Sequence, residues 1–215
     1  MLNVRSIITA AAVATLIAIP VVSTAQTAAR PELKLGDTWT YRYTGPGVAR
    51  TEVLKVSEAV AKGGFRITIE ETAQGGAAGI TGEKAEPGER RMLVSTDLNP
   101  MLRDPQNAPA LQEFLRFRWP LEPGKNWSFP NNGANFTFTW DVKADGWESV
   151  TVPAGTFKAL KLSMTRSGGR GSGSEVLWYA PEAKGLVKRV TNYASSERRN
   201  AIDTTTIELT SYKVD

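Results

Sequence analysis

Few side chains of this protein are suited to catalysis, because its 215 residues include no histidine and no cysteine. Thiol nucleophiles, serine–histidine–aspartate triads, histidine bases and the usual zinc and copper sites are therefore excluded. Among the carboxylates, Asp145 and Glu148 flank Gly146-Trp147. A glycosidase needs two carboxyl groups roughly 5–10 Å apart, so this pair is the candidate for a hydrolase, and an ordinary turn is the competing interpretation.

No cofactor or metal site is predicted. The glycine-rich run at residues 168–174 lacks the Gly-Lys-Ser/Thr ending of a phosphate-binding loop, so we interpret it as a hairpin tip. No loop with clustered aspartate and asparagine indicates calcium.

The elements that would position any site are strands, because apolar and polar residues alternate along most of the chain. The clearest alternations fall at residues 39–43, 65–69, 136–140, 160–164 and 207–211. Each predicts a strand with one buried and one solvated face. Glycine, proline and asparagine clusters between them predict turns. The pattern as a whole predicts an all-β, antiparallel domain of roughly ten strands.

Residues 1–25 have the layout of a secretory signal peptide. Arg5 precedes an apolar stretch from Ile7 to Val22, which is shorter than the roughly 20 residues of a membrane span. Small residues lead up to a cleavage site after Ala25, and a retained anchor is the alternative. We therefore expect a periplasmic or secreted protein with no transmembrane segment after cleavage. The net charge of +4 is too small to indicate a nucleic-acid partner.

Residues 26–215 are expected to form a single all-β domain made of two loosely similar halves, at about 31–97 and 119–213. Both halves begin with the same sequence motif, because Leu33, Gly36 and Trp39 recur 88 positions later as Leu121, Gly124 and Trp127. In each copy the glycine permits a sharp turn into a strand, and the tryptophan fills a large space in the core.

A proline-rich crossover at residues 98–118 joins the two halves. Within it Leu111, Phe114 and Leu115 have helical spacing, which predicts one or two helical turns.

Two motifs in the second half resemble a known group of proteins. They are Pro153-Ala-Gly-Thr-Phe157 and the run from Trp178-Tyr-Ala-Pro to Gly-Leu-Val-Lys188. The patterns PAGxF and WYxPxxGxVK are similar to those of secreted β-sheet domains of unknown function in bacterial envelopes, including domains related to the TapB family. The resemblance covers about residues 115–213. It implies an antiparallel sheet curled into a half-barrel, and it carries no established activity.

A curled sheet has a concave face, which offers an apolar groove where side chains leave it unfilled. We expect aromatic residues to line this groove and basic residues at its rim to hold an anionic head group. The candidate binding residues are Phe117, Trp119, Trp140, Trp147, Trp178, Arg116, Arg118 and Lys188. Core packing is the competing interpretation of each aromatic residue.

These observations favour a non-catalytic β-domain that binds a lipid-like or amphipathic ligand, or an anionic small ligand, in its concave face. One alternative is a scaffold or assembly module that binds an envelope protein at a sheet edge. The other is the carboxylate-dependent glycan hydrolase that would use Asp145 and Glu148.

Overall fold

The computed structural model describes residues 26–60, 63–74, 89–107, 110–168, 172–194 and 202–215. The predicted signal peptide and the centre of the glycine-rich hairpin tip lie outside the described residues. No helix in these ranges is long and apolar enough to cross a membrane.

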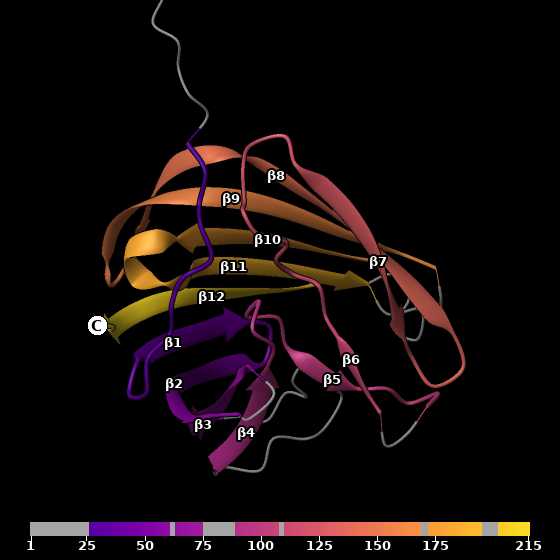
Figure 1. Ribbon diagram of the computed structural model, residues 1–215, viewed down its shortest axis with the longest axis horizontal. Helices are drawn as coiled ribbons and strands as arrows, with labels where there is room; N and C mark the ends of the chain where they lie inside the picture. Colours follow the sequence, from indigo (N-terminus) through magenta and orange to yellow (C-terminus); the bar gives the residue numbers. More distant parts are fainter. Residues whose placement is uncertain (1–25, 61–62, 75–88, 108–109, 169–171, 195–201) are drawn as a thin grey trace, which may run out of the picture.

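A single open antiparallel sheet dominates the described part of the chain and curves around the segments packed on one of its faces (Figure 1). Its ten strands follow the order β4-β3-β2-β1-β12-β11-β10-β9-β8-β7, and β5 and β6 form a separate pair. The all-β prediction of roughly ten antiparallel strands is therefore confirmed. The elements are β1 (Thr38–Gly45), β2 (Val48–Ala59), β3 (Phe65–Gln74), β4 (Glu89–Val94), β5 (Met101–Arg103), β6 (Leu111–Glu113), β7 (Asn126–Asn132), β8 (Thr137–Val152), β9 (Gly155–Ser167), β10 (Gly173–Ala180), the 3-10 helix η1 (Pro181–Ala183), β11 (Gly185–Ala194) and β12 (Ile202–Lys213).

The inner face of the sheet is the one on which the chain between β4 and β7 packs (Figure 1). Residues directly opposite each other on paired strands share a face. Leu177 of β10 therefore shares the inner face with Leu162 of β9 and Arg189 of β11, which stand opposite it. All further assignments to the inner or outer face in the regular strands follow from such pairs.

The crossover from β4 to β7 fills the apolar part of the inner face. Phe114, Phe117 and Leu121 are 5%, 7% and 0% exposed and pack on residues of β7 to β10. Buried Asn99 holds the segment in place, because its amide donates to the Phe117 carbonyl at 3.0 Å and accepts from the Phe117 N–H at 2.7 Å.

The helical turns expected around Leu111 are absent, so that prediction is wrong. Leu111 lies instead in β6, where it pairs with Arg103 of β5. Pairing with a neighbouring strand outweighs the local helical spacing here, and Pro105 between the two strands suits a turn.

The apolar core has two clusters of buried residues. The first gathers side chains of β7 to β10 with the crossover, and the second gathers side chains of β1 to β4 with those of β11 and β12 and the tip of the β8–β9 hairpin. Leu98 of the crossover packs against both clusters. The described residues therefore form one connected interior along one sheet.

The two copies of the repeated motif, at residues 33–39 and 121–127, adopt the same local structure. Gly36 and Gly124 have positive φ angles of 93° and 87°. Their N–H groups donate to the carbonyls of Val56 and Ala144, at 2.9 and 2.8 Å. The strand that receives each bond has an irregularity in its pairing directly after the accepting residue, between Val56 and Glu58 in β2 and between Ala144 and Gly146 in β8. The 88-residue displacement extends along each hairpin, since Trp39 pairs with Leu54 and Thr44 with Ala49 in the first, and Trp127 with Val142 and Asn132 with Thr137 in the second.

Replacing Gly36 or Gly124 with alanine is expected to lower the free energy of unfolding by about 1–2 kcal/mol, because a side chain is strained at these φ angles. No heavy atom lies within 4 Å of the position that either new Cβ would take, so backbone strain is the only cost. Gly146→Ala is the matched control: it has the same free space and no positive φ. Urea unfolding should place this control within about 0.5 kcal/mol of the wild type. Equal stability of all three variants would show that the strain argument is wrong.

Candidate ligand site on the inner face of the sheet

The structure divides the eight predicted binding residues between the two faces of the sheet. Five lie on or against the inner side: Arg116, Phe117, Trp119, Trp140 and Trp147. Trp178 and Lys188 lie on the outer face, where they stand opposite each other on β10 and β11. Arg118 is exposed. The eight residues therefore do not form one groove.

The outer-face residues have partners of their own. The Trp178 indole donates to the Glu148 carboxylate at 2.5 Å, and the ammonium groups of Lys161 and Lys188 each lie 5.9 Å from the centre of its rings. Lys188 also pairs with Glu208 at 3.2 Å. Polar partners thus surround Trp178 on the outer face, and the residue also packs against the second cluster of buried residues.

The aromatic residues on the inner side pack against one another. Phe117 stacks on Trp119 with ring centres 5.2 Å apart, and Tyr179 meets both rings edge-on. The Trp119 indole also donates to the Asp97 carbonyl at 2.8 Å. Core packing, the competing interpretation, therefore describes Phe117 and Trp140, which are 7% and 3% exposed.

Next to this aromatic packing, the inner face carries a group of charged residues, which we call the Glu175 cluster: Glu175, Arg116, Arg166, Arg189 and Tyr193. Glu175 is 1% exposed. Its Oε2 atom lies 3.8 Å from both Arg116 Nη2 and Arg189 Nε, and its Oε1 atom accepts a hydrogen bond from the Tyr193 hydroxyl. Arg166 stacks on the Tyr193 ring, with its guanidinium carbon 5.2 Å from the ring centre.

The electrostatics of the cluster keep Glu175 ionised. Burial alone raises the pKa of its carboxyl, but Arg189, Arg116 and the Tyr193 hydroxyl outweigh burial and leave that pKa below its usual value. Burial and the neighbouring carboxylate raise the pKa of the Tyr193 phenol above its ordinary value, so the phenol stays neutral. Burial lowers the pKa of the Arg116 guanidinium, although arginine still holds its proton at pH 7.

A second charged group on the same face is balanced. Glu52 and Glu71 have side chains 5% and 3% exposed, and they share Arg90, which bonds them at 2.7 and 3.2 Å. Arg50 bonds Glu52 at 3.0 Å, and the Tyr43 hydroxyl donates to Glu52 at 2.5 Å. Two arginines thus face two carboxylates.

Of the residues in these two charged groups, only Arg116 was among the binding residues predicted from the sequence. The alternation of residues in the sequence could have indicated Glu175, because it lies two and four positions before Leu177 and Tyr179 and so shares their face of the strand. A charged residue at a core-facing position is a candidate functional residue. Arg166 and Arg189 are brought beside it by the pairing of distant strands.

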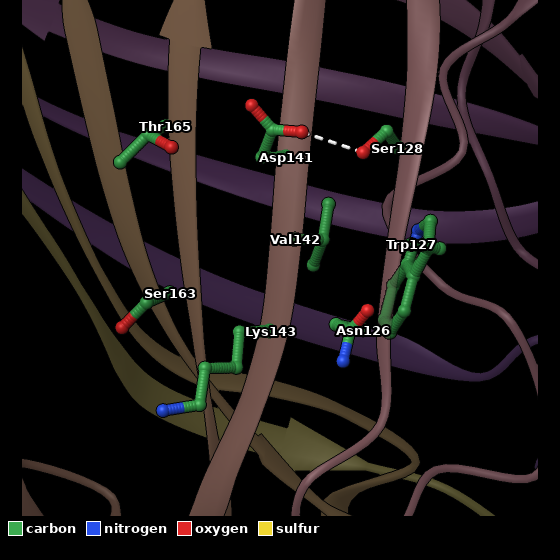
Figure 2. Close-up of a pocket in the computed structure, with 8 residues that line it drawn as sticks. All are labelled: Asn126, Trp127, Ser128, Asp141, Val142, Lys143, Ser163 and Thr165. Atoms are coloured by element: carbon green, nitrogen blue, oxygen red, sulfur yellow. Dashed lines mark hydrogen bonds between the residues drawn. The ribbon is translucent and has the colours of Figure 1, made fainter.

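A surface hollow of about 330 Å³ lies over β7, β8 and β9 (Figure 2). Its labelled side chains come from adjacent positions on the three strands, and Asp141 accepts a hydrogen bond from Ser128 at 2.5 Å. The hollow is lined by Asn126, Trp127, Ser128, Asp141, Val142, Lys143, Ser163 and Thr165. It contains no charged group that is both buried and unpaired, unlike the inner face.

The two carboxylates of the hydrolase hypothesis each accept a hydrogen bond from a residue of another strand. Asp145 accepts from the Ser163 hydroxyl at 2.5 Å and lies 3.5 Å from Lys143, whereas Glu148 accepts from Trp178. Both are exposed. The described residues contain no group of three or more acidic side chains placed to hold a metal ion.

Comparison with known proteins identifies the family of this chain. Residues 53–194, more than half of the chain, match DUF3108, a family described as proteins of unknown function. The chain belongs to this family. The finer relation to TapB, with its two patterns, stays a prediction from the sequence. Curated proteins give no significant match.

Two solved structures are similar over most of the chain. One is described as an exported protein with a YmcC-like fold from Bacteroides fragilis; it is 17% identical, covers 86% of this chain and 99% of its own, and has a TM-score of 0.47. The other is described as a lipoprotein from Parabacteroides distasonis; it is 14% identical, covers 87% of this chain and 100% of its own, and has a TM-score of 0.46.

Proposed function

We propose that this DUF3108 protein is a non-catalytic component of the cell envelope and binds an amphipathic, lipid-like ligand at the inner face of its sheet. The signal-peptide pattern of residues 1–25 supports an envelope or secreted location. The lack of histidine and cysteine supports a binding role over a catalytic one.

One observation carries the proposal: the Glu175 cluster adjoins the half-buried aromatic ring of Phe138. The Arg166 guanidinium carbon lies 4.3 Å from the centre of the Phe138 ring, and Arg166 stands opposite buried Trp140 on the paired strand. Phe138 and Arg166 are both half-buried. A polar head group would lie on the guanidinium groups, and an apolar tail would lie along Phe138. The crossover packs on the apolar part of the inner face.

A fluorescence titration of residues 26–215 with a dansyl-labelled fatty acid tests this proposal. We expect saturable binding, because the probe presents one anionic group and one apolar chain. Phe138→Ser should weaken the binding about tenfold, through the loss of apolar contact area.

Leu111→Ser is the matched control, since Leu111 is an apolar residue 49% exposed and is not a member of the cluster. It should bind the probe as the wild type does. Uptake that never saturates, or equal loss of binding in both variants, would contradict the proposal.

The sheet edges give less support to the alternative of a scaffold module. Edge strand β7 contains Pro130, which has no N–H to donate, and the Gln112 side chain bonds both the N–H and the carbonyl of Asn132. Edge strand β4 carries Arg90 and Arg91. Proline, side-chain caps and charges at an edge all discourage pairing with another chain.

A further inference from the structure

We infer that the Glu175 cluster binds a dianionic phosphate group, carried either by a lipid or by free inorganic phosphate. This inference rests on the proposed function and names the chemistry of the head group.

The first step is charge. Among the described residues, three guanidinium groups surround the Glu175 carboxylate: Arg116 and Arg189 at 3.8 Å, and Arg166, which also lowers the pKa of that carboxyl. The neighbouring Glu52 and Glu71 are paired with Arg50 and Arg90, which balance their two charges. Three guanidinium groups against one carboxylate leave the Glu175 cluster, as defined, with two positive charges in excess, and the Asp203 carboxylate, which stands opposite Tyr193 on β12, is exposed.

Burial makes this excess costly. The Arg116 and Arg189 side chains are each 12% exposed, and that of Glu175 is 0% exposed. Buried charges stay stable only when they are paired and hydrogen-bonded. An anion with two charges would neutralise the cluster.

The second step is hydrogen bonding. The Nε atoms of Arg116, Arg166 and Arg189 are buried and have no hydrogen-bond partner among the described residues. The Oε2 atom of Glu175 has none either, because 3.8 Å is too long for a hydrogen bond. Nε is one of the donors with which arginine grips an oxyanion. Three such donors of the Glu175 cluster therefore lack a hydrogen-bond partner.

The third step is the kind of anion. Arginine binds phosphate through two parallel hydrogen bonds, which gives both geometry and strength. A phosphate monoester carries a charge of about −1.5 to −2 at pH 7, which matches the excess. A carboxylate would balance half of it.

Calorimetric titration of residues 26–215 at low salt and neutral pH tests the inference with three probes: inorganic phosphate, dodecyl phosphate and dodecyl maltoside. The two dodecyl compounds are used below their micelle concentrations. We expect inorganic phosphate to bind, dodecyl phosphate to bind at least about tenfold more tightly, and the uncharged maltoside to bind far more weakly.

Three variants locate the site. Arg166→Gln should weaken phosphate binding about tenfold or more, whereas Arg66→Gln, which removes an exposed arginine paired with Glu58, should leave it unchanged. Glu175→Gln should tighten binding roughly tenfold, because it removes a repelling charge. A residue with a purely structural role would not produce a gain of affinity.

The outcomes distinguish the phosphate site from the proposed binding of an amphipathic ligand. Equal binding of phosphate and dodecyl phosphate supports the anion site with free phosphate as its source, and it contradicts an amphipathic ligand. Equal binding of both dodecyl compounds without binding of inorganic phosphate overturns the anion site and leaves the proposed function standing. Absence of binding by all three probes overturns both. Phosphate binding that Arg166→Gln leaves unchanged also overturns the site.

Discussion

The Glu175→Gln variant is expected to lose about 3–5 kcal/mol of its free energy of unfolding at pH 7, in the absence of added phosphate. Removing one partner of a buried ionic group costs this much, because the charges left behind remain buried. Glu175 is 1% exposed and faces Arg116 and Arg189 at 3.8 Å. Glutamine keeps the size of the side chain, so the loss reports on charge more than on packing.

The loss should depend on pH in one direction. The pKa of the Glu175 carboxyl is lower in the folded protein than its usual value, because the arginines outweigh burial. Its stabilisation is therefore complete above the unfolded pKa of about 4.3, and it disappears as the pH falls through the lower folded pKa. The gap between wild type and Glu175→Gln should be widest at neutral pH and narrow in acid.

Urea unfolding at several pH values measures this gap, since urea does not screen charges. Glu58→Gln is the control, because Glu58 makes an ion pair with Arg66 and its side chain is 57% exposed. Exposed pairs contribute about 0–1 kcal/mol, so this variant should stay close to the wild type. A gap that is already small at pH 7, or one that is constant into acid, would refute the account of the cluster.

Truncation of the tryptophan in either repeated motif should lower the free energy of unfolding by a similar amount. We expect Trp39→Ala and Trp127→Ala each to lower the free energy of unfolding by about 3–5 kcal/mol. Trp39 and Trp127 are 4% and 5% exposed. Their indoles donate to the carbonyls of Ala183 and Leu115, each at 2.7 Å, so truncation also leaves a buried acceptor without its donor.

Thermal and urea unfolding of phenylalanine variants separate these two effects. Trp39→Phe and Trp127→Phe keep most of the apolar area and lose the N–H group, so each should cost about 1–3 kcal/mol. Leu35→Ala is the control, because Leu35 is 62% exposed. A wild-type melting temperature for either alanine variant would show that the tryptophan has no part in holding the sheet together.

Local sequence predicted the features that depend on one strand or one turn. Alternation located strands such as those at residues 65–69 and 160–164, which lie in β3 and β9. The positive φ of Gly36 and Gly124 followed from a glycine before each strand. These features arise from steric and solvation preferences that depend only on residues close together in the sequence.

Predictions from local spacing were wrong where a segment packs against residues that are distant in the sequence. Leu111 and Phe114 have helical spacing, yet Leu111 pairs in a strand and Phe114 is buried under the sheet. Aromatic residues were expected to gather in one groove, but the register of β10 with β9 and β11 puts Trp178 on the outer face, beside lysines.

The sequence by itself determined the fold class, the positions of most strands and the chemistry that is excluded, because composition and alternation act within a few residues. Only the tertiary structure decided the candidate site. Arg116 arrives from the crossover, Arg166 from β9 and Arg189 from β11, and their separation along the chain hides their common neighbour, Glu175. The physical reason is that electrostatic energy depends on distance in space and on burial, and the pairing of remote strands sets both.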